Sequence, residues 1–262
     1  IEYYLIGENE AIDTINSVRM ARQFPGADAS NAYGVFGHSQ GGHAALWAGA
    51  VAPAYAPELD LVGVAGAAPA AELASLVSQQ WADTVSWVIG PEVFTSFPAA
   101  YPELDLDQVA SPDATKWYES IAGGCMLQAM VEGRVLQHLG KTAFKVNPMT
   151  VPAWAQALTA QTIKPLPASM PVLITESVND AVVIPSTIAL LQEKWCAAGS
   201  TLQVDWLGPL RGSAGTPSSM THIYEGAVGG ALATSWFDQR FAGATPVTNC
   251  GTQPPVTPAP AS

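Results

Sequence analysis

The segment that most constrains the fold runs from Tyr33 to Ala50, where three structural signals follow one another without a gap. It begins with the apolar run YGVFG, which is typical of a short strand. It passes through Gly37-His38-Ser39-Gln40-Gly41, and the small apolar residues of 42–50 then predict a buried helix. Strand, glycine-flanked serine and helix in this order favour an α/β fold with Ser39 at a sharp turn.

The pattern Gly-x-Ser-x-Gly at 37–41 suits an activated serine. A serine hydroxyl is a poor nucleophile unless such a turn aims its oxygen at a base and a substrate carbonyl. We expect Gly37 and Gly41 to remove side chains that would clash, and the Gln40 amide at the helix N-terminus to hold a developing oxyanion. A glycine-rich turn without chemistry is the alternative. The strand before it and the helix after it favour Ser39 as a nucleophile.

A serine nucleophile needs a general base, and the chain has four histidines: His38, His43, His138 and His222. His38 and His43 lie within four residues of Ser39, so we expect them to pack or to support the turn rather than face its hydroxyl. His138 lies on a predicted helix, where a polar surface role is favoured. His222 follows the last predicted strand in a loop, and such loops carry catalytic histidines. His222 is therefore the predicted base.

The third group is a carboxylate that orients the imidazole. The apolar run 170–175 (MPVLIT) predicts a buried parallel strand, and Asp180 lies in the loop beyond it, where open α/β sheets place their sites. Glu176 is a rival, but it follows the strand directly and is expected to point elsewhere. The predicted triad is Ser39, Asp180 and His222, in the chain order of α/β-hydrolases.

These residues carry a family resemblance, together with the segments YLIGENEA (4–11), GHSQGGHAALWAG (37–49), MPVLITESVNDAVVIP (170–185) and LQEKWCAAGSTLQVDWL (191–207). The chain resembles the secretory lipases of the α/β-hydrolase superfamily, which include the fungal lipase A type and actinobacterial secreted lipases. The resemblance implies an α/β-hydrolase fold, secretion, and cleavage of carboxylic esters or acylglycerols through an acyl-enzyme, with no cofactor or metal. The chain departs from the family at 177–179, which lacks the usual glycine, and in the long loop 208–221.

Two other functions stay open at this stage. An acyltransferase would use the same triad on an acceptor other than water. A non-catalytic binding protein with a hydrolase-like scaffold is the third reading. The resemblance implies several strands before the elbow, which is the turn at 37–41 that carries Ser39, and this sequence shows none of them. The early loop that supplies the family's other oxyanion amide would be missing together with those strands.

The start of the chain, 1–22, reads instead as a short extended piece followed by an amphipathic helix, with Ile12, Ile15, Val18 and Met20 on its apolar face. Ile1 is not an initiator methionine, so we expect a processed or cut start. The elbow strand would then lie at an open edge of the sheet, which proteins normally protect. We expect a second chain, a second copy in a dimer, or the rest of a longer precursor to cover it.

Alternation of strands and helices predicts a parallel sheet with strands at 33–37, 61–67, 170–175 and 202–207. The hydrolase core is predicted at 1–69 and 169–262, and a helical cap or lid at 70–168. Within the cap we expect a helix over 71–89 that ends at Gly90-Pro91. Its many aromatic residues suit an acyl-binding cap and the plain packing of a helical subdomain equally well.

Charge excludes some partners. Lys and Arg number 10 against 22 Asp and Glu, a net charge of −12, which argues against nucleic acid and anionic membrane surfaces. No uninterrupted apolar run approaches the about 18 residues that a membrane span needs.

The chain has three cysteines, and an odd count in a secreted protein suggests a missing partner. Cys196 and Cys250 flank elements of the C-terminal core and could form a disulfide, and the resemblance implies a partner for Cys125 in the absent N-terminal part. Three reduced thiols are the alternative, and the spacing excludes a structural zinc site. We expect the Pro- and Thr-rich tail from Thr245 to be poorly ordered.

Overall fold

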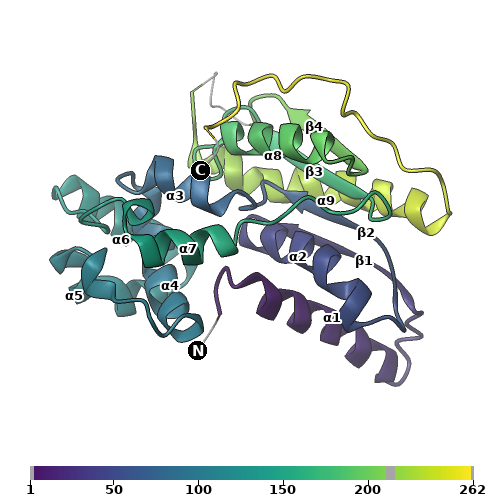
Figure 1. Cartoon of the computed structure of the whole chain (residues 1–262), viewed down its shortest axis with the longest axis horizontal. Helices are drawn as coiled ribbons and strands as arrows, with labels where there is room; N and C mark the ends of the chain where they lie inside the picture. Colours follow the sequence, from purple (N-terminus) through teal and green to yellow (C-terminus); the bar gives the residue numbers. More distant parts are fainter. Residues whose placement is uncertain (1–2, 211–215, 261–262) are drawn as a thin grey trace. The chain divides into compact units, whose positions relative to one another are not determined.

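The computed structural model describes residues 3–210 and 216–260 (Figure 1). The chain divides into two compact units. One comprises residues 7–72 and 163–260 and contains the sheet, and the other comprises residues 3–6 and 73–162 and is helical.

The sheet has the predicted strands in parallel, ordered β1-β2-β3-β4: β1 Ala32–His38, β2 Asp60–Ala67, β3 Val172–Ser177 and β4 Leu202–Leu207. The α/β prediction is confirmed. β3 is buried along its whole length and runs through Ser177, so Glu176 lies inside the strand and not after it as expected. The strand continues because Glu176 pairs in register with Trp206 of β4.

Helices pack on both faces of the sheet (Figure 1). On one face, α2 (Gln40–Tyr55) approaches Val64, because a Cβ on Gly49 would lie 3.3 Å from the Val64 methyl groups. On the other face, α9 (Ser219–Phe241) lies so close that a Cβ on Gly229 would be 2.5 Å from the Ala67 Cβ. Successive strand residues point to opposite faces, so Val64 and Ala67 of β2 face different helices. The lack of a side chain at Gly49 and at Gly229 lets each helix come close to the strand.

Two further helices complete this unit. α1 (Gly7–Gln23) packs on α2 and buries Ile15, while α8 (Pro185–Ala197) packs on β3 and β4. The expectation for Met20 was wrong, since it is 63% exposed. The apolar face of α1 is formed by Ala11 and Ile15, which are four residues apart, and Met20 lies off that stripe.

β1 pairs with β2 alone among the described strands, so its other side is a sheet edge. Its face toward α9 is covered residue by residue: a Cβ on Gly34 would meet the Phe237 ring at 2.4 Å, and Phe36 lies beside Gly230. Phe36 keeps 38% of its surface exposed. The cover that we expect for this edge stays a prediction.

The C-terminal tail is held against the core, contrary to the expectation of a poorly ordered end. Cys196 and Cys250 form the predicted disulfide. Asn249 pairs with the outer edge of β4, because Val204 N–H donates to its Oδ1 at 2.9 Å and its Nδ2 donates to the Val204 carbonyl at 2.7 Å. Ala259 N–H donates to the Ser186 carbonyl at 2.8 Å. The side-chain amide of Asn249 thus pairs with backbone groups at the edge of β4, a contact that the composition of the tail does not predict.

The helical unit contains α3 Leu73–Gln80, α4 Val85–Ala100, α5 Pro112–Ala122, α6 Met126–His138 and α7 Pro152–Ala160. The predicted helix end at Gly90-Pro91 was wrong, because both residues lie inside α4. Gly90 lets the Phe144 ring approach, with a Cβ placed 3.2 Å from it. Burial of Trp87, Phe94 and Phe97 on α4 outweighs the about 3 kcal/mol that an interior proline costs.

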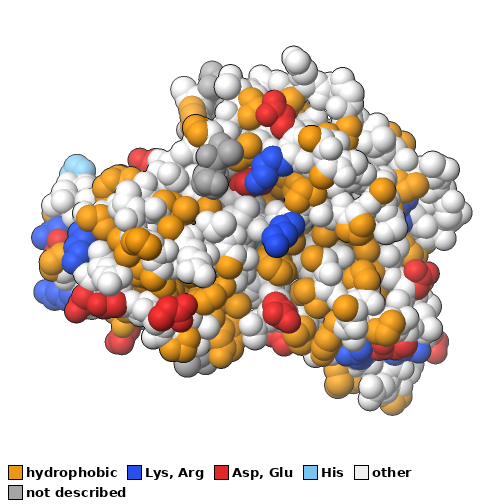
Figure 2. Space-filling model, viewed as in Figure 1, with side chains coloured by type: hydrophobic (Ala, Val, Ile, Leu, Met, Phe, Trp, Pro, Cys, Tyr) orange, Lys and Arg blue, Asp and Glu red, His pale blue; other side chains and the backbone are white. Residues whose placement is uncertain are grey.

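The aromatic residues of this unit form its core, where Phe97 stacks on Trp154 with ring centroids 6.4 Å apart. Packing therefore accounts for them. Hydrophobic side chains also reach the surface: Leu127, Val131 and Val135 of α6 are each more than half exposed. Charged side chains are sparse on the face drawn in Figure 2. Within residues 3–210 and 216–260, no helix has the length and apolar character of a membrane span.

Candidate active site

Ser39 is the single residue between β1 and α2, and its backbone is strained. Its φ of 59° and ψ of −119° lie where side chains other than glycine rarely go. Three hydrogen bonds hold it there. Ser39 N–H donates to the Ala67 carbonyl at 2.9 Å, and its own carbonyl accepts from His43 N at 3.1 Å and Ala70 N at 3.3 Å. The end of β2 and the first turn of α2 thus fix the turn that carries the serine.

Glycines make room for this turn, as expected at position 37 but at position 42 instead of position 41. A Cβ on Gly37 would lie 1.9 Å from the Gly41 carbonyl oxygen, and one on Gly42 would lie 2.9 Å from Pro69 Cα. The expectation for Gly41 was wrong, since no atom of the described residues lies within 4 Å of a Cβ built there. Position 41 faces open space, whereas position 42 faces the backbone that follows β2.

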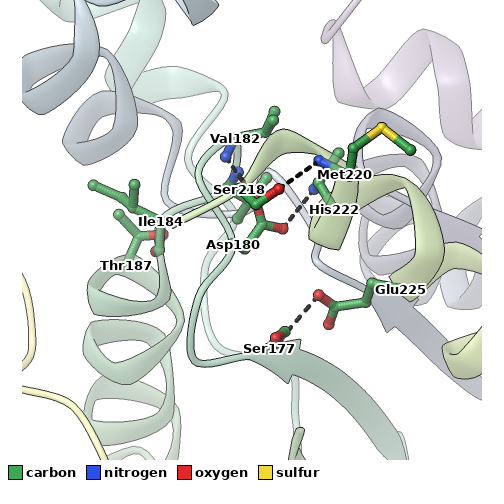
Figure 3. Close-up of polar contacts among 10 residues, drawn as sticks. Ser177, Asp180, Val182, Ile184, Thr187, Ser218, Met220, His222 and Glu225 are labelled. Atoms are coloured by element: carbon green, nitrogen blue, oxygen red, sulfur yellow. Dashed lines mark hydrogen bonds and ion pairs between the residues drawn. The ribbon is translucent and has the colours of Figure 1, made fainter. Parts of the chain in front are cut away.

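Asp180 and His222 meet directly. His222 Nδ1 lies 2.6 Å from Asp180 Oδ2, and both side chains are buried (Figure 3). His222 was expected in a loop, but it belongs to the first turn of α9. The helix begins early because Ser218 caps it, its Oγ accepting from Met220 N–H at 3.2 Å.

The Asp180 carboxylate is fixed from its other side by the turn after β3. Its Oδ1 accepts backbone N–H groups from Val182 at 2.6 Å and Val183 at 3.2 Å. Ser218 N–H donates to the Asn179 carbonyl at 3.0 Å, so the turn and the start of α9 are joined next to the pair. Three donors thus fix the position of this buried carboxylate.

The imidazole of His222 lies beside the residue that precedes Ser39. The His38 and His222 rings have centroids 4.5 Å apart and planes tilted by 43°. Gly226 permits this approach, because a Cβ there would lie 3.0 Å from the His38 ring. The site thus forms where the carboxyl ends of β1 and β3 meet α9, as open α/β sheets do.

His38 itself is uncharged at neutral pH. Burial, and then the nearby charge of His222, lower the pKa of His38 to about 4, partly offset by a hydrogen bond to the His222 backbone. Its Nε2 is buried without a hydrogen-bond partner among the described residues. A neutral ring there can pack against His222 without competing with it for a proton.

Behind the elbow, Glu10 of α1 ties down the first turn of α2. The Gln40 side-chain amide donates to Glu10 Oε1, and His43 Nδ1 lies 2.9 Å from Glu10 Oε2. Trp47 Nε1 donates to His43 Nε2 at 2.9 Å, so Nδ1 of His43 carries the hydrogen. His43 is fully buried and engaged at both nitrogens, as expected of a supporting residue.

Sequence reasoning missed Glu10, because nothing in its neighbourhood distinguishes it from a surface acid at a helix start. The remaining histidine, His138, is the last residue of α6 in the helical unit and is exposed.

Two more acids lie beside Asp180. Carboxylate oxygens of Glu176, Asp180 and Glu225 lie within 4.8 Å of one another, a spacing that could suit a cation. Asp180, however, already uses both oxygens for His222 and two amides. Glu225, three residues after His222 on α9, was missed by sequence reasoning, although that spacing puts both on one helix face.

These two acids hold their protons at unusually high pH. Burial, then the charges of the neighbouring acids, raises the pKa of Glu176 well above its ordinary value. Burial and the charge of Asp180 raise the pKa of Glu225 to about 8, against a hydrogen bond from Ser177 that lowers it. Glu225 is therefore mostly neutral at pH 7, and the raised pKa of Glu176 favours its neutral form.

Comparison with solved structures shows the same fold. An esterase LipA from Xanthomonas oryzae, described as rice cell wall degrading, superimposes with a TM-score of 0.73 at 18% identity, covering 91% of this chain and 67% of the esterase. Lipase A from Candida antarctica superimposes with a TM-score of 0.70 at 18% identity, covering 98% of this chain and 61% of the lipase. The predicted α/β-hydrolase fold is confirmed.

Sequence comparison agrees. Lipase 6 of Candida albicans is 24% identical over 253 residues, covering 91% of this chain and 52% of that lipase. Lipase A of Moesziomyces aphidis is 24% identical over 275 residues, covering 97% of this chain and 54% of that lipase. The chain thus spans about half the length of these relatives. A model of the secretory lipase family matches residues 2–249, so the chain belongs to the secretory lipase family.

Proposed function

We propose that the chain hydrolyses carboxylic esters through a Ser39–His222–Asp180 triad and an acyl-enzyme. The observation that carries the proposal is the buried contact of 2.6 Å between His222 Nδ1 and Asp180 Oδ2, beside a serine in a strained elbow. A serine alone on such a turn would be unreactive, and a buried His–Asp pair alone would have no nucleophile.

The contacts assign a role to each atom. Because Nδ1 of His222 is bonded to Asp180, Nε2 is the nitrogen left to take the proton of Ser39. The Ser39 oxygen attacks the ester carbonyl, and the imidazolium returns its proton to the alcohol that leaves. Water then attacks the acyl-Ser39 by the reverse route, with His222 again as the base. This chemistry needs no cofactor or metal.

Gln40 supplies an oxyanion donor in this mechanism. Its backbone N–H opens α2, and its side chain is held by Glu10 from α1. A fixed amide at a helix N-terminus stabilises a developing negative charge without reorganising. Loss of one such donor costs about 10²-fold to 10³-fold in rate in enzymes of this kind.

Carboxylic esters, including acylglycerols, are the proposed substrates, because the relatives are named lipases and an esterase. We propose secretion on the family name and the disulfide, and we propose the unit 73–162 as the cap of the enzyme. The net charge of −12 disfavours nucleic acid as a partner.

Active-site labelling and hydrolysis test the proposal together. Purified protein is treated with a fluorophosphonate, the labelled residue is mapped by mass spectrometry, and turnover of p-nitrophenyl butyrate and octanoate is measured. We expect a label on Ser39, turnover of the esters, and loss of both in Ser39→Ala. Turnover retained by a pure Ser39→Ala sample would refute the assignment.

The open edge of β1 motivates a second candidate, a hydrolase-like binding protein whose site is not activated. Absence of labelling in folded protein would favour it. An acyltransferase would also be labelled at Ser39. It would hydrolyse the esters slowly, and an added alcohol acceptor would raise the rate at which the ester is consumed.

We propose that a second copy or another polypeptide pairs with the β1 edge. Light scattering coupled to size-exclusion chromatography tests this, because a well-behaved monomer without a second chain would exclude both.

A further inference from the structure

Glu176 and Glu225 have no part in the proposed mechanism, yet both are fully buried beside it. Glu225 lies one helical turn after His222 on α9, and Glu176 is the second-last residue of β3. Fully buried acids are rare without a partner, because burial disfavours a charged carboxylate strongly. Two of them next to a predicted catalytic aspartate call for a physical explanation.

Glu225 connects the helix of His222 to the turn of Asp180. Its Oε2 accepts the Ser177 N–H at 3.1 Å (Figure 3). The carbonyl of the same Ser177 accepts the Asp180 N–H at 3.1 Å. One carboxyl on α9 therefore holds the end of β3 from which the Asp180 turn starts. A change in the rotation of α9 would move His222 and this contact together.

The three neighbouring acids Glu176, Asp180 and Glu225 differ in the partners that could stabilise a negative charge. Asp180 uses both of its oxygens as acceptors, one for two backbone amides and one for His222. Both oxygens of Glu176 and Oε1 of Glu225 are buried and have no hydrogen-bond partner among the described residues. Three negative charges within 4.8 Å would repel one another, which favours a proton on this pair.

No described cation offsets that repulsion. The titratable group that faces the pair is Asp180 from the turn after β3, which in turn contacts His222 of α9, and the His222 ring packs on His38 of β1. His38 is neutral above about pH 4. The ionisation of Glu225 would therefore be felt by Asp180 and His222 without compensation from a neighbouring charge.

We propose that Glu225 is a positioning residue for the His222–Asp180 pair, acting as a neutral acid. The inference rests on the proposed function for its meaning. In it, Glu225 holds α9 against the end of β3, and its neutrality keeps a single negative charge beside the imidazole. It touches neither the substrate nor the reacting atoms.

Three variants separate the two parts of this role. Glu225→Gln is neutral at every pH and keeps an oxygen for the Ser177 N–H. Glu225→Ala removes that acceptor. Asp238→Asn changes an exposed acid on the same helix and serves as the matched control.

Two readouts are needed. The first is kcat and KM for p-nitrophenyl butyrate from pH 5 to 10. The second is the NMR titration of the His222 ring carbon over the same range, which requires no turnover and is assigned with His222→Gln.

In wild-type protein we expect the His222 signal to report a second inflection near pH 8, when Glu225 ionises. The inflection should be absent in Glu225→Gln and unchanged in Asp238→Asn. Glu225→Gln should keep kcat within about threefold at pH 7, and Glu225→Ala should lower kcat by up to about 10²-fold with KM nearly unchanged, the cost of a misplaced catalytic group.

An inflection that persists in Glu225→Gln would overturn the role of Glu225 as a neutral acid. Equal losses in Glu225→Gln and Glu225→Ala would overturn the positioning role. If the wild type is neither labelled by the fluorophosphonate nor able to hydrolyse the esters, the proposed function fails. The His222 titration still decides whether Glu225 and the imidazole are coupled. If Glu225→Ala does not fold, the comparison of wild type with Glu225→Gln decides alone.

Discussion

Reduction of the Cys196–Cys250 disulfide should destabilise the sheet unit by a predictable amount. The bond joins the end of α8 to the tail across 54 residues. In the chain-entropy account, closing a loop of that length in the unfolded state is worth about 4 kcal/mol. The tail has its own contacts with the core, through Asn249 to β4 and Thr252 to Gln192, so the fold should survive reduction.

The assay is urea unfolding, followed by circular dichroism, of wild type and Cys196→Ser/Cys250→Ser, with and without reductant. A loss of about 4 kcal/mol corresponds to roughly 8–16 °C in Tm for a chain of this size. Cys125→Ser is the matched control, because Cys125 is exposed and lies outside the disulfide, and it should unfold like wild type.

Alkylation without reductant should label one thiol, Cys125. Three labelled thiols, or a change in the free energy of unfolding below about 1 kcal/mol on reduction, would refute the reasoning.

Three further predictions concern the site. The raised pKa values of Glu176 and Glu225 mean that the folded state holds protons that the unfolded state releases, so stability is complete below about pH 4.5 and falls as pH rises to about 8. Thermal melts should show Tm decreasing over that range by the equivalent of about 4 kcal/mol for Glu225 alone, and Glu225→Gln should flatten the profile; a Tm that rises from pH 5 to pH 8 would contradict it. Gly37→Ala should prevent the elbow from forming, because its Cβ would lie 1.9 Å from the Gly41 carbonyl, whereas Gly41→Ala should fold normally; equal stability of the two by thermal melting would show that the crowding is not real. Asp180→Asn should keep the fold but lower kcat by about 10³-fold to 10⁴-fold, because an amide stabilises the wrong imidazole tautomer, and nearly unchanged hydrolysis would remove Asp180 from the mechanism.

Sequence reasoning located the sheet because its signals are local. Short apolar runs are typical of buried parallel strands, which made 33–37, 61–67 and 170–175 recognisable, and 202–207 alternates apolar and polar residues as a half-buried strand does. The elbow is also local, since Ser39 needs its glycines within a few residues. The carboxyl ends of parallel strands meet at one edge, so the sequence could predict Asp180 near the base before any contact was known.

What the sequence hid depends on contacts between distant segments. Glu10 supports Gln40 and His43 from 30 and 33 residues away, and Glu225 reaches Ser177 over 48 residues. Gly42 rather than Gly41 is crowded because Pro69 follows the neighbouring strand. Pro91 stays inside α4 because burial of its neighbours outweighs a strong local signal. Such features have no local periodicity or motif to reveal them.

The account stands on an activated Ser39 beside the His222–Asp180 pair, and site-mapped fluorophosphonate labelling of the 262-residue chain tests this most directly. Wild type and His222→Ala are compared at matched fold, verified by circular dichroism. We predict a single label on Ser39 in wild type and a loss of labelling of at least about 10³-fold in His222→Ala, because the unassisted hydroxyl is a poor nucleophile. Folded wild type that remains unlabelled, or equal labelling of both proteins, would contradict the account.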